Sequence, residues 1–171
     1  MERPLPRRTE GARLSDRIPR ALLLSGGDRR ALGRQARDAA PAEACGLLLG
    51  EVRPEGVRVD RVLDAANLAP GEGRFLVDPA AQLRAEGLAA RLGLQLIGAW
   101  HSHPNGPCVL SRADLAGAGA YPVALIVGSG PPGAAGPRLA AWWVEEGRQH
   151  RLRIEESSRA PFSAASGQPK G

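Results

Sequence analysis

Residues 100–114 read WHSHPNGPCVLSRAD and bring two histidines, a serine and an aspartate into one short segment. A catalytic zinc takes three protein ligands and keeps a fourth position open, and imidazole nitrogens and carboxylate oxygens are among its preferred ligands. His101, His103 and Asp114 would supply such a set. The alternative is a chance His-x-His pair followed by Ser111 and Asp114 as an ordinary helix cap. This segment alone leaves both interpretations open.

The elements around the segment determine where its side chains point. Residues 94–100 (LQLIGAW) form an apolar run of strand length, which predicts a buried strand. Because side chains alternate along a strand, His101 and His103 at its exit should project to the same side. Ser111 and Asp114 have the spacing of an N-cap and a first-turn acidic residue, which predicts that a helix begins there. A strand end and a helix start can therefore bring the three ligands to one point.

A second segment that could take part in chemistry lies far upstream, at residues 41–50 (PAEACGLLLG). Glu43 precedes an apolar, strand-like run that Gly50 should end. A carboxylate within hydrogen-bond reach of a metal-activated water can take its proton and deliver it to a leaving amine. Without its context, a glutamate at such a junction is more often an exposed surface charge.

Together, the strings E-A-C-G-L-L-L-G and H-S-H-P-x6-S-x-x-D resemble the JAMM (MPN+, Mov34/PAD-1) metalloprotease family. The closest likeness is to its compact bacterial members, which act beside ubiquitin-like sulfur carrier proteins. The resemblance covers residues 20–155, with weaker likenesses at Asn67 and at residues 75–79 (FLVDP). It implies the α/β class with a single JAMM/MPN domain, in which helices flank a curved mixed β-sheet, a cytidine-deaminase-like fold.

The resemblance also implies a role for each motif residue. The cofactor is zinc, one ion per chain, and the positions that match its ligands are His101, His103 and Asp114. Glu43 matches the general acid/base, and Ser111 matches the residue that steadies the oxyanion. The chain departs from the family at Leu110, where proline is usual; a proline would fix φ and prepare the first helical turn, so we expect a looser Ser111.

By resemblance, the reaction is hydrolysis of an amide bond at the C-terminus of a ubiquitin-like sulfur carrier protein (ThiS/MoaD-like), after its Gly-Gly end. The leaving group would be cysteine, as in cysteine biosynthesis, or a peptide extension, which makes the enzyme a peptidase or isopeptidase. Two alternatives remain. The first is a non-catalytic MPN scaffold, which the intact ligand set disfavours. The second is a RadC-like DNA-associated protein, which the E-A-C-G-L-L-L-G segment disfavours.

The distribution of charge argues against nucleic acid as a partner. The chain has a formal net charge of +5. Residues 1–20 carry six arginines against three acidic residues, whereas residues 21–156 hold fifteen basic and fifteen acidic residues. The body therefore offers no net field to a phosphate backbone. We expect a flexible Arg/Pro-rich arm at 1–18, one JAMM/MPN+ domain at 19–156 and a disordered tail at 157–171.

From the composition we expect a cytoplasmic protein. No apolar run approaches the ~18 residues that a membrane span needs, and no secretory signal is recognisable. The two cysteines fit reduced thiols rather than a disulfide framework. Cys45 should be a small buried residue, and Cys108, in the loop between the ligands, would be reactive only as an exposed thiolate of low pKa. The oligomeric state is left open.

Periodicity and turn residues predict the remaining elements. His150 should lie on the surface or at a rim. Trp142 and Trp143 alternate faces, which leaves exposure of one of them open, and core packing is the default expectation for both. The predicted helices cover residues 28–39, 79–92 and 111–119, and the predicted strands cover 18–24, 44–49, 57–66, 94–101, 123–127, 138–145 and 150–155, the last two as a hairpin around Glu146 and Gly147.

Overall fold

A computed structural model of the protein describes residues 18–69, 74–117, 121–129 and 136–158. The predicted arm (1–18) and tail (157–171) therefore lie almost wholly outside the described residues. In chain order, the elements are β1 (Ala21–Leu24), α1 (Gly26–Ala39), β2 (Cys45–Arg53), β3 (Gly56–Ala65), α2 (Pro79–Leu92), β4 (Gln95–His103), α3 (Arg112–Gly117), β5 (Val123–Gly128), β6 (Arg138–Glu145) and β7 (Arg148–Glu156).

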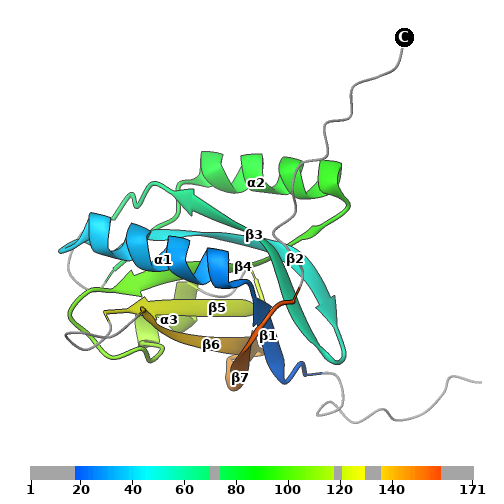
Figure 1. The fold of residues 1–171 in the computed structure, drawn as a ribbon. Coiled ribbons are helices and arrows are strands. Elements are labelled where there is room, and N and C mark those ends of the chain that lie inside the picture. Colours follow the sequence, from blue (N-terminus) through cyan, green and yellow to red (C-terminus); the bar gives the residue numbers. More distant parts are fainter. Residues whose placement is uncertain (1–17, 70–73, 118–120, 130–135, 159–171) are drawn as a thin grey trace, which may run out of the picture.

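The strands form one mixed sheet that curls into a closed barrel, in the order β1-β3-β2-β4-β5-β6-β7. β4 and β5 run parallel, as do the two pairs that β1 makes with β3 and β7, and the other neighbours are antiparallel. The predicted α/β fold with a curved mixed sheet is confirmed. Its curvature goes far enough for the first strand to pair with the last, as Figure 1 shows for β1 and β7.

The two long helices cover opposite faces of this sheet. Successive side chains of β2 alternate, so Leu48 belongs to a buried cluster that includes Leu32 of α1. Leu47 and Leu49 point the other way and form a second cluster with Ala85 of α2. In Figure 1, the β2–β3 part of the sheet lies between α1 and α2. The helices thus fix the sheet from both sides, and the strand that carries the histidines lies next to β2.

Capping residues set the ends of the helices. α1 begins at Gly26, two residues earlier than predicted, because the Ser25 hydroxyl accepts a hydrogen bond from the Asp28 amide at 3.0 Å. α2 has its predicted bounds: Asp78 caps its start, and Gly93 ends it with a left-handed φ of 66°. Among the described residues, no helix combines the length and the apolarity needed to cross a membrane.

β2 and β4 are both longer than the sequence predicted. Gly50 does not end β2, which continues through a register irregularity to its last residue, Arg53. A side chain at Gly50 would overlap the Arg58 carbonyl, so this glycine permits a close approach of two strands rather than a turn. β4 continues to His103 and pairs with β5 along both histidine positions. His101 and His103 therefore lie within a paired strand and not beyond its exit.

The closing hairpin has the predicted position. Glu146 and Gly147 both have positive φ, 50° and 73°, between β6 and β7. Trp142 is buried, and Trp143 is half-buried and packs against the core, which agrees with the core packing expected for the pair. Trp142 belongs to a buried cluster with Ile126 and Ala140, and the guanidinium of Arg151 covers its ring at 4.4 Å from the centroid.

Candidate metal centre

The alternation of β4 places its two histidines on one face. His101 is 2% exposed and His103 is partly buried. Their Nε2 atoms approach to 3.0 Å, which brings the two donor nitrogens to one point. The side chains between and before them, Ser102 and Trp100, point into the opposite, buried face. The two histidines therefore lie on the same side of the strand, as predicted.

Asp114 completes this group from the first turn of α3. One carboxylate oxygen lies 3.3 Å from Nε2 of His101, and the other lies 3.6 Å from Nε2 of His103. Ser111 holds that carboxylate in a reciprocal cap: its amide donates to Asp114 Oδ2 at 2.7 Å, and its hydroxyl accepts from the Asp114 amide at 3.1 Å. Asp114 therefore takes part both in the helix cap and in the candidate ligand group, which the sequence left as alternatives.

Leu110 takes part in holding this turn. It packs with Cys108 against the buried cluster of Ile126, Ala140 and Trp142. Partial burial of this aliphatic side chain just before α3 anchors the backbone there by a different means from the fixed φ of a proline. The cap hydrogen bonds of Ser111 form in the presence of Leu110.

The spacing of the three donors suits a tetrahedral metal. Ligand atoms about 2.0–2.1 Å from a zinc ion are separated by roughly 3.3 Å in a tetrahedron. The two Nε2 atoms lie 3.0 Å apart, Asp114 Oδ1 lies 3.3 Å from His101 Nε2, and Asp114 Oδ2 lies 3.6 Å from His103 Nε2. With one ligand atom taken from each residue, all three lie within 4.8 Å of one another. His103 Nδ1 lies 2.8 Å from the Pro107 carbonyl, which fixes the tautomer that leaves Nε2 free for a metal. These three residues form the one group of potential metal ligands found among the described residues.

Contacts within the group shift the pKa values of Asp114 and His103. Burial acts to raise the pKa of Asp114, but hydrogen bonds from His101, His103 and the Ser111 amide outweigh it and hold this pKa well below its usual range. The hydrogen bond to Asp114 raises the pKa of His103, against the effect of burial. An anionic carboxylate beside two imidazoles is the charge arrangement that a divalent cation requires.

Glu43 lies just before β2, 7% exposed, and within electrostatic reach of the three candidate ligands. Burial raises its pKa, and the nearby histidines offset part of that rise. Its Oε2 atom is buried and has no hydrogen-bond partner within the described part of the chain. A buried carboxylate oxygen without a partner is costly unless a ligand or a water supplies one, so the predicted surface alternative for Glu43 was wrong.

Ser102 positions Glu43, and sequence reasoning gave it no role. It is fully buried, its hydroxyl accepts from the Ala44 amide at 2.8 Å, and its own amide donates to the Ala44 carbonyl at 2.8 Å. These two bonds join the residue after Glu43 to the residue between the histidines. The signal was present in the sequence: a serine between two same-face histidines must point into the core, where its hydroxyl needs a partner.

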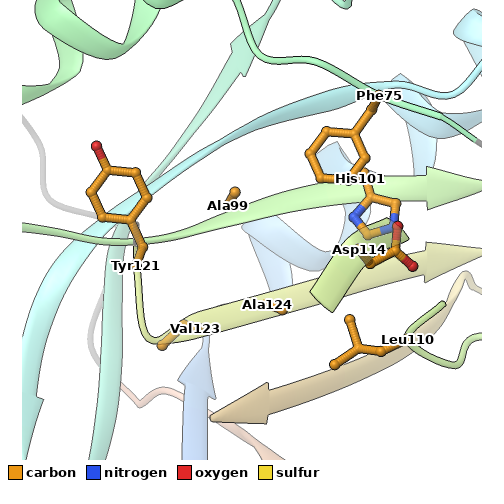
Figure 2. A pocket seen from close by; sticks show the side chains of 8 residues that line it. All are labelled: Phe75, Ala99, His101, Leu110, Asp114, Tyr121, Val123 and Ala124. Atoms are coloured by element: carbon orange, nitrogen blue, oxygen red, sulfur yellow. The ribbon is translucent and has the colours of Figure 1, made fainter. Parts of the chain in front are cut away.

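A cleft opens beside the candidate ligands. It has a volume of about 400 Å³ and runs from Asp114 and Phe75 across Ala99 towards Val77 and Gln82. A smaller pocket shares Phe75, Ala99 and Asp114 with it. Figure 2 shows Phe75 and Asp114 close to His101, with Tyr121, which precedes β5, on the far side of Ala99. The lining is mostly apolar, so an uncharged, extended segment of a ligand would fit beside the metal group.

The remaining candidates lie outside this group. Cys45 is buried as predicted, and burial raises the pKa of its thiol to about 11. Cys108 is half-buried, and burial raises its pKa as well, which is the opposite of a reactive thiol. His150 lies in β7, partly exposed, where it pairs across the hairpin with Trp143.

Comparison with known proteins gives matches over most of the chain. A family model described as prokaryotic homologs of the JAB domain matches residues 27–145. A probable TtuB-protein conjugate cleaving protease of Thermus thermophilus is 40% identical over 77 residues, which is 44% of this chain. That match spans 49% of the length of the Thermus protein, so it covers about half of that relative.

Two solved structures are similar to this chain over about four fifths of its length. A protein of Desulfitobacterium hafniense, 28% identical, superimposes with a TM-score of 0.70 over 81% of this chain and 94% of its own. A protein of Salinibacter ruber, 30% identical, does so with a TM-score of 0.53 over 77% of this chain and 88% of its own. Both are solution structures.

Proposed function

The chain belongs to the prokaryotic homologs of the JAB domain, the family that its motifs resemble, and we propose that it is a zinc-dependent metallopeptidase or isopeptidase. One observation carries the proposal: three donor atoms converge at the end of β4 and the start of α3, next to a buried glutamate oxygen without a partner. A non-catalytic scaffold has no need for a buried, unpaired carboxylate at this place.

His101, His103 and Asp114 would hold one zinc ion per chain. When bound, zinc supplies Lewis-acid chemistry: it polarises a carbonyl oxygen and lowers the pKa of water to about 7. Pro107 acts on this site through its carbonyl, which keeps a proton on His103 Nδ1 and so orients Nε2. The Ser111 amide likewise orients the Asp114 carboxylate by donating a hydrogen bond to its Oδ2 atom.

Glu43 is the proposed general acid/base. Its raised pKa moves the carboxyl towards the range in which it both accepts and returns a proton near neutral pH. Its backbone is held by the Ser102–Ala44 bonds, so its position relative to the histidines is fixed. The proton that Glu43 takes from the attacking water would pass to the amine that leaves.

Ser111 is the proposed donor to the developing oxyanion. Its oxygen already accepts from the Asp114 amide, and its hydroxyl proton is not used in that bond. The residue is exposed, at the mouth of the site, where a substrate carbonyl could reach it. A donor in such a position typically contributes ~10²–10³ in rate.

As substrate we propose the C-terminus of a ubiquitin-like sulfur carrier protein (ThiS/MoaD-like), joined after its Gly-Gly end to cysteine or to a peptide. The name of the Thermus relative, a protease that cleaves TtuB-protein conjugates, supports a conjugate of this kind. The apolar cleft beside Asp114 suits an extended tail. Free thiols at Cys45 and Cys108 fit a reducing cytoplasm, the compartment in which such cysteine biosynthesis would take place.

The test combines zinc content with hydrolysis. Purified protein should contain about one zinc per chain and should release cysteine from a carrier–cysteine adduct, or a peptide from a carrier–peptide fusion, as followed by mass spectrometry. Glu43→Gln should retain the zinc and lose ~10²–10⁴ of the rate, because general acid–base catalysis typically contributes that much. Glu55→Gln, an exposed glutamate in the β2–β3 turn, is the matched control and should change neither.

An active Glu43→Gln variant would contradict the mechanism. If the protein contains zinc but hydrolyses neither substrate, the proposed metal site stands and the proposed substrate is rejected. Absence of both would favour a non-catalytic scaffold. Salt-dependent binding of DNA by the protein would favour the RadC-like alternative.

A further inference from the structure

Asn67 lies just after β3, and its side-chain amide uses all of its hydrogen-bonding capacity. The Nδ2 group donates to the Glu43 carbonyl at 3.0 Å and to the Arg74 carbonyl at 3.4 Å. Its Oδ1 atom accepts from the Ala69 amide and from the Leu76 amide, both at 3.0 Å. An amide has two donor hydrogens and two acceptor lone pairs, so this arrangement fixes its orientation.

The partners of Asn67 belong to two separate parts of the site. One is the backbone of Glu43, the proposed general acid/base. Two others, Arg74 and Leu76, are the neighbours of Phe75 on either side. A single side chain therefore fixes the position of Glu43 and of Phe75 relative to one another, although the two are far apart in the sequence.

Phe75 in turn contacts a proposed zinc ligand. Its ring stacks on the His101 ring with centroids 4.1 Å apart and an angle of 15° between the planes. Figure 2 shows the two rings next to each other. A flat partner at this distance resists rotation of the imidazole about its χ2 bond, because rotation would drive the ring edge into the phenyl face. His103 is held differently, through the hydrogen bond of its Nδ1 atom to Pro107.

We propose that Asn67 and Phe75 form a positioning unit: Asn67 joins the Glu43 backbone to the Phe75 segment, and Phe75 sets the ring plane of His101. The unit rests on the proposed function only in that Glu43 and His101 are taken as the proton carrier and a zinc ligand. It assigns a physical role to the two positions whose resemblance to the family was weakest in the sequence. It also predicts that disturbing Asn67 affects the His101 ring, which Asn67 does not touch.

Phe75 also lines the cleft, so the competing explanation is that it binds substrate and does nothing for the metal. The two roles differ in what they change. A substrate contact affects KM, whereas a positioning contact affects zinc affinity and kcat. Some residues do not bind the metal themselves but orient a ligand that does. Their removal typically lowers metal affinity or activity about 10- to 100-fold.

The experiment compares four variants with the wild-type protein. Phe75→Leu removes the flat ring but keeps an apolar side chain, and Phe75→Tyr keeps the ring. Asn67→Asp keeps the acceptor for Leu76 and removes the donor to Glu43 and Arg74. Leu83→Ala is the control, because Leu83 is 70% exposed on α2 and outside the unit.

Zinc affinity from chelator competition should fall about 10- to 100-fold in Phe75→Leu and should be restored in Phe75→Tyr. Asn67→Asp should lower kcat about tenfold or more, with KM within about twofold, because the Glu43 carbonyl loses its donor. Leu83→Ala should match the wild type. A rise in KM alone for Phe75→Leu would overturn the proposal in favour of a substrate contact.

NMR of the zinc-free protein separates this proposal from the proposed function. The chain has three histidines, so the ring protons of His101 can be assigned in a ¹H–¹³C aromatic spectrum. Phe75 should shift them upfield, Phe75→Leu should abolish the shift, and Asn67→Asp should reduce it. If the wild type shows no zinc and no hydrolysis while these shifts behave as expected, the function fails and the unit stands. Unchanged shifts in both variants would overturn the unit, whatever the activity.

Discussion

The two faces of β4 handle their polar groups in opposite ways. On the buried face, the Trp100 indole donates to the Leu63 carbonyl at 2.9 Å, and the Ser102 hydroxyl accepts from the Ala44 amide at 2.8 Å. On the other face, His101 and His103 point their Nε2 atoms at one another and at Asp114. The polar groups on the first face have hydrogen-bond partners within the protein. The second face brings together nitrogen and oxygen atoms that a cation could bind.

The difference shows how a strand can support a reactive site. On the core face, the hydrogen bonds of Trp100 and Ser102 join β4 to the backbone of β3 and of the segment before β2, and the same strand carries both histidines. The site face can then tolerate a close pair of imidazoles and a buried carboxylate. Stability should therefore depend on the core face, and metal binding on the other. A substitution that removes a ligand should therefore spare the stability of the zinc-free protein, and a substitution in the core should reduce that stability.

Asp114→Asn should have the largest effect. The asparagine can still accept from the Ser111 amide through its side-chain oxygen, but it removes the negative charge between two imidazoles. We expect the loss of zinc affinity to exceed the ~10–100-fold that an outer-shell change costs, and hydrolysis to disappear. The melting temperature without zinc should change far less than the rise that zinc confers on the wild type. Chelator competition and thermal unfolding with and without zinc measure both; a variant that binds zinc normally would reject Asp114 as a ligand.

Ser111→Ala should affect rate more than stability. Loss of the N-cap costs about 1 kcal/mol of unfolding free energy, whereas loss of an oxyanion donor costs ~10²–10³ in kcat. Ser111→Thr keeps both the cap and the hydroxyl and should recover most of the activity. Chemical denaturation and steady-state kinetics give the two quantities. If kcat falls only as far as the zinc occupancy of the variant, the role of Ser111 is limited to holding Asp114.

Much of this arrangement follows from the sequence, and the part that does not has a physical reason. Strand alternation and helix-cap spacing predict that the two histidines share a side and that Asp114 joins them, because both rules are local. Closure of the barrel depends on pairing of β1 with β7, a contact between distant segments that no local pattern encodes. The role of Asn67 depends on loop backbone from three places in the chain, so its residue type alone predicts no partner.

Ser102→Ala tests the core face directly. The substitution leaves the Ala44 amide without its acceptor in a part-buried position, and an unsatisfied buried donor costs about 1–3 kcal/mol. We expect that loss in urea denaturation of the zinc-free protein. Ser129→Ala is the matched control, since its hydroxyl donates to the Pro104 carbonyl from an exposed position and should matter little. Equal losses in the two variants would show that burial of the Ala44 amide is not the cause.

Cys108 should give the smallest effect, although it lies between two proposed ligands in the sequence. Its thiol packs beside Leu110 against Ile126 and donates to the Arg138 carbonyl at 3.6 Å. Burial raises its pKa, so the thiolate fraction at pH 7.5 is smaller than that of a free cysteine, and alkylation of the folded protein should be correspondingly slow.

Cys108→Ala should keep zinc affinity and kcat within about twofold of the wild type, because the candidate metal group among the described residues consists of His101, His103 and Asp114 without a thiol. Iodoacetamide labelling followed by mass spectrometry, together with zinc content before and after labelling, checks both statements. Rapid labelling that releases zinc would place the thiol on the metal. The metal site would then include a residue of the loop after β4, and it would no longer be confined to the histidine face of that strand and to Asp114.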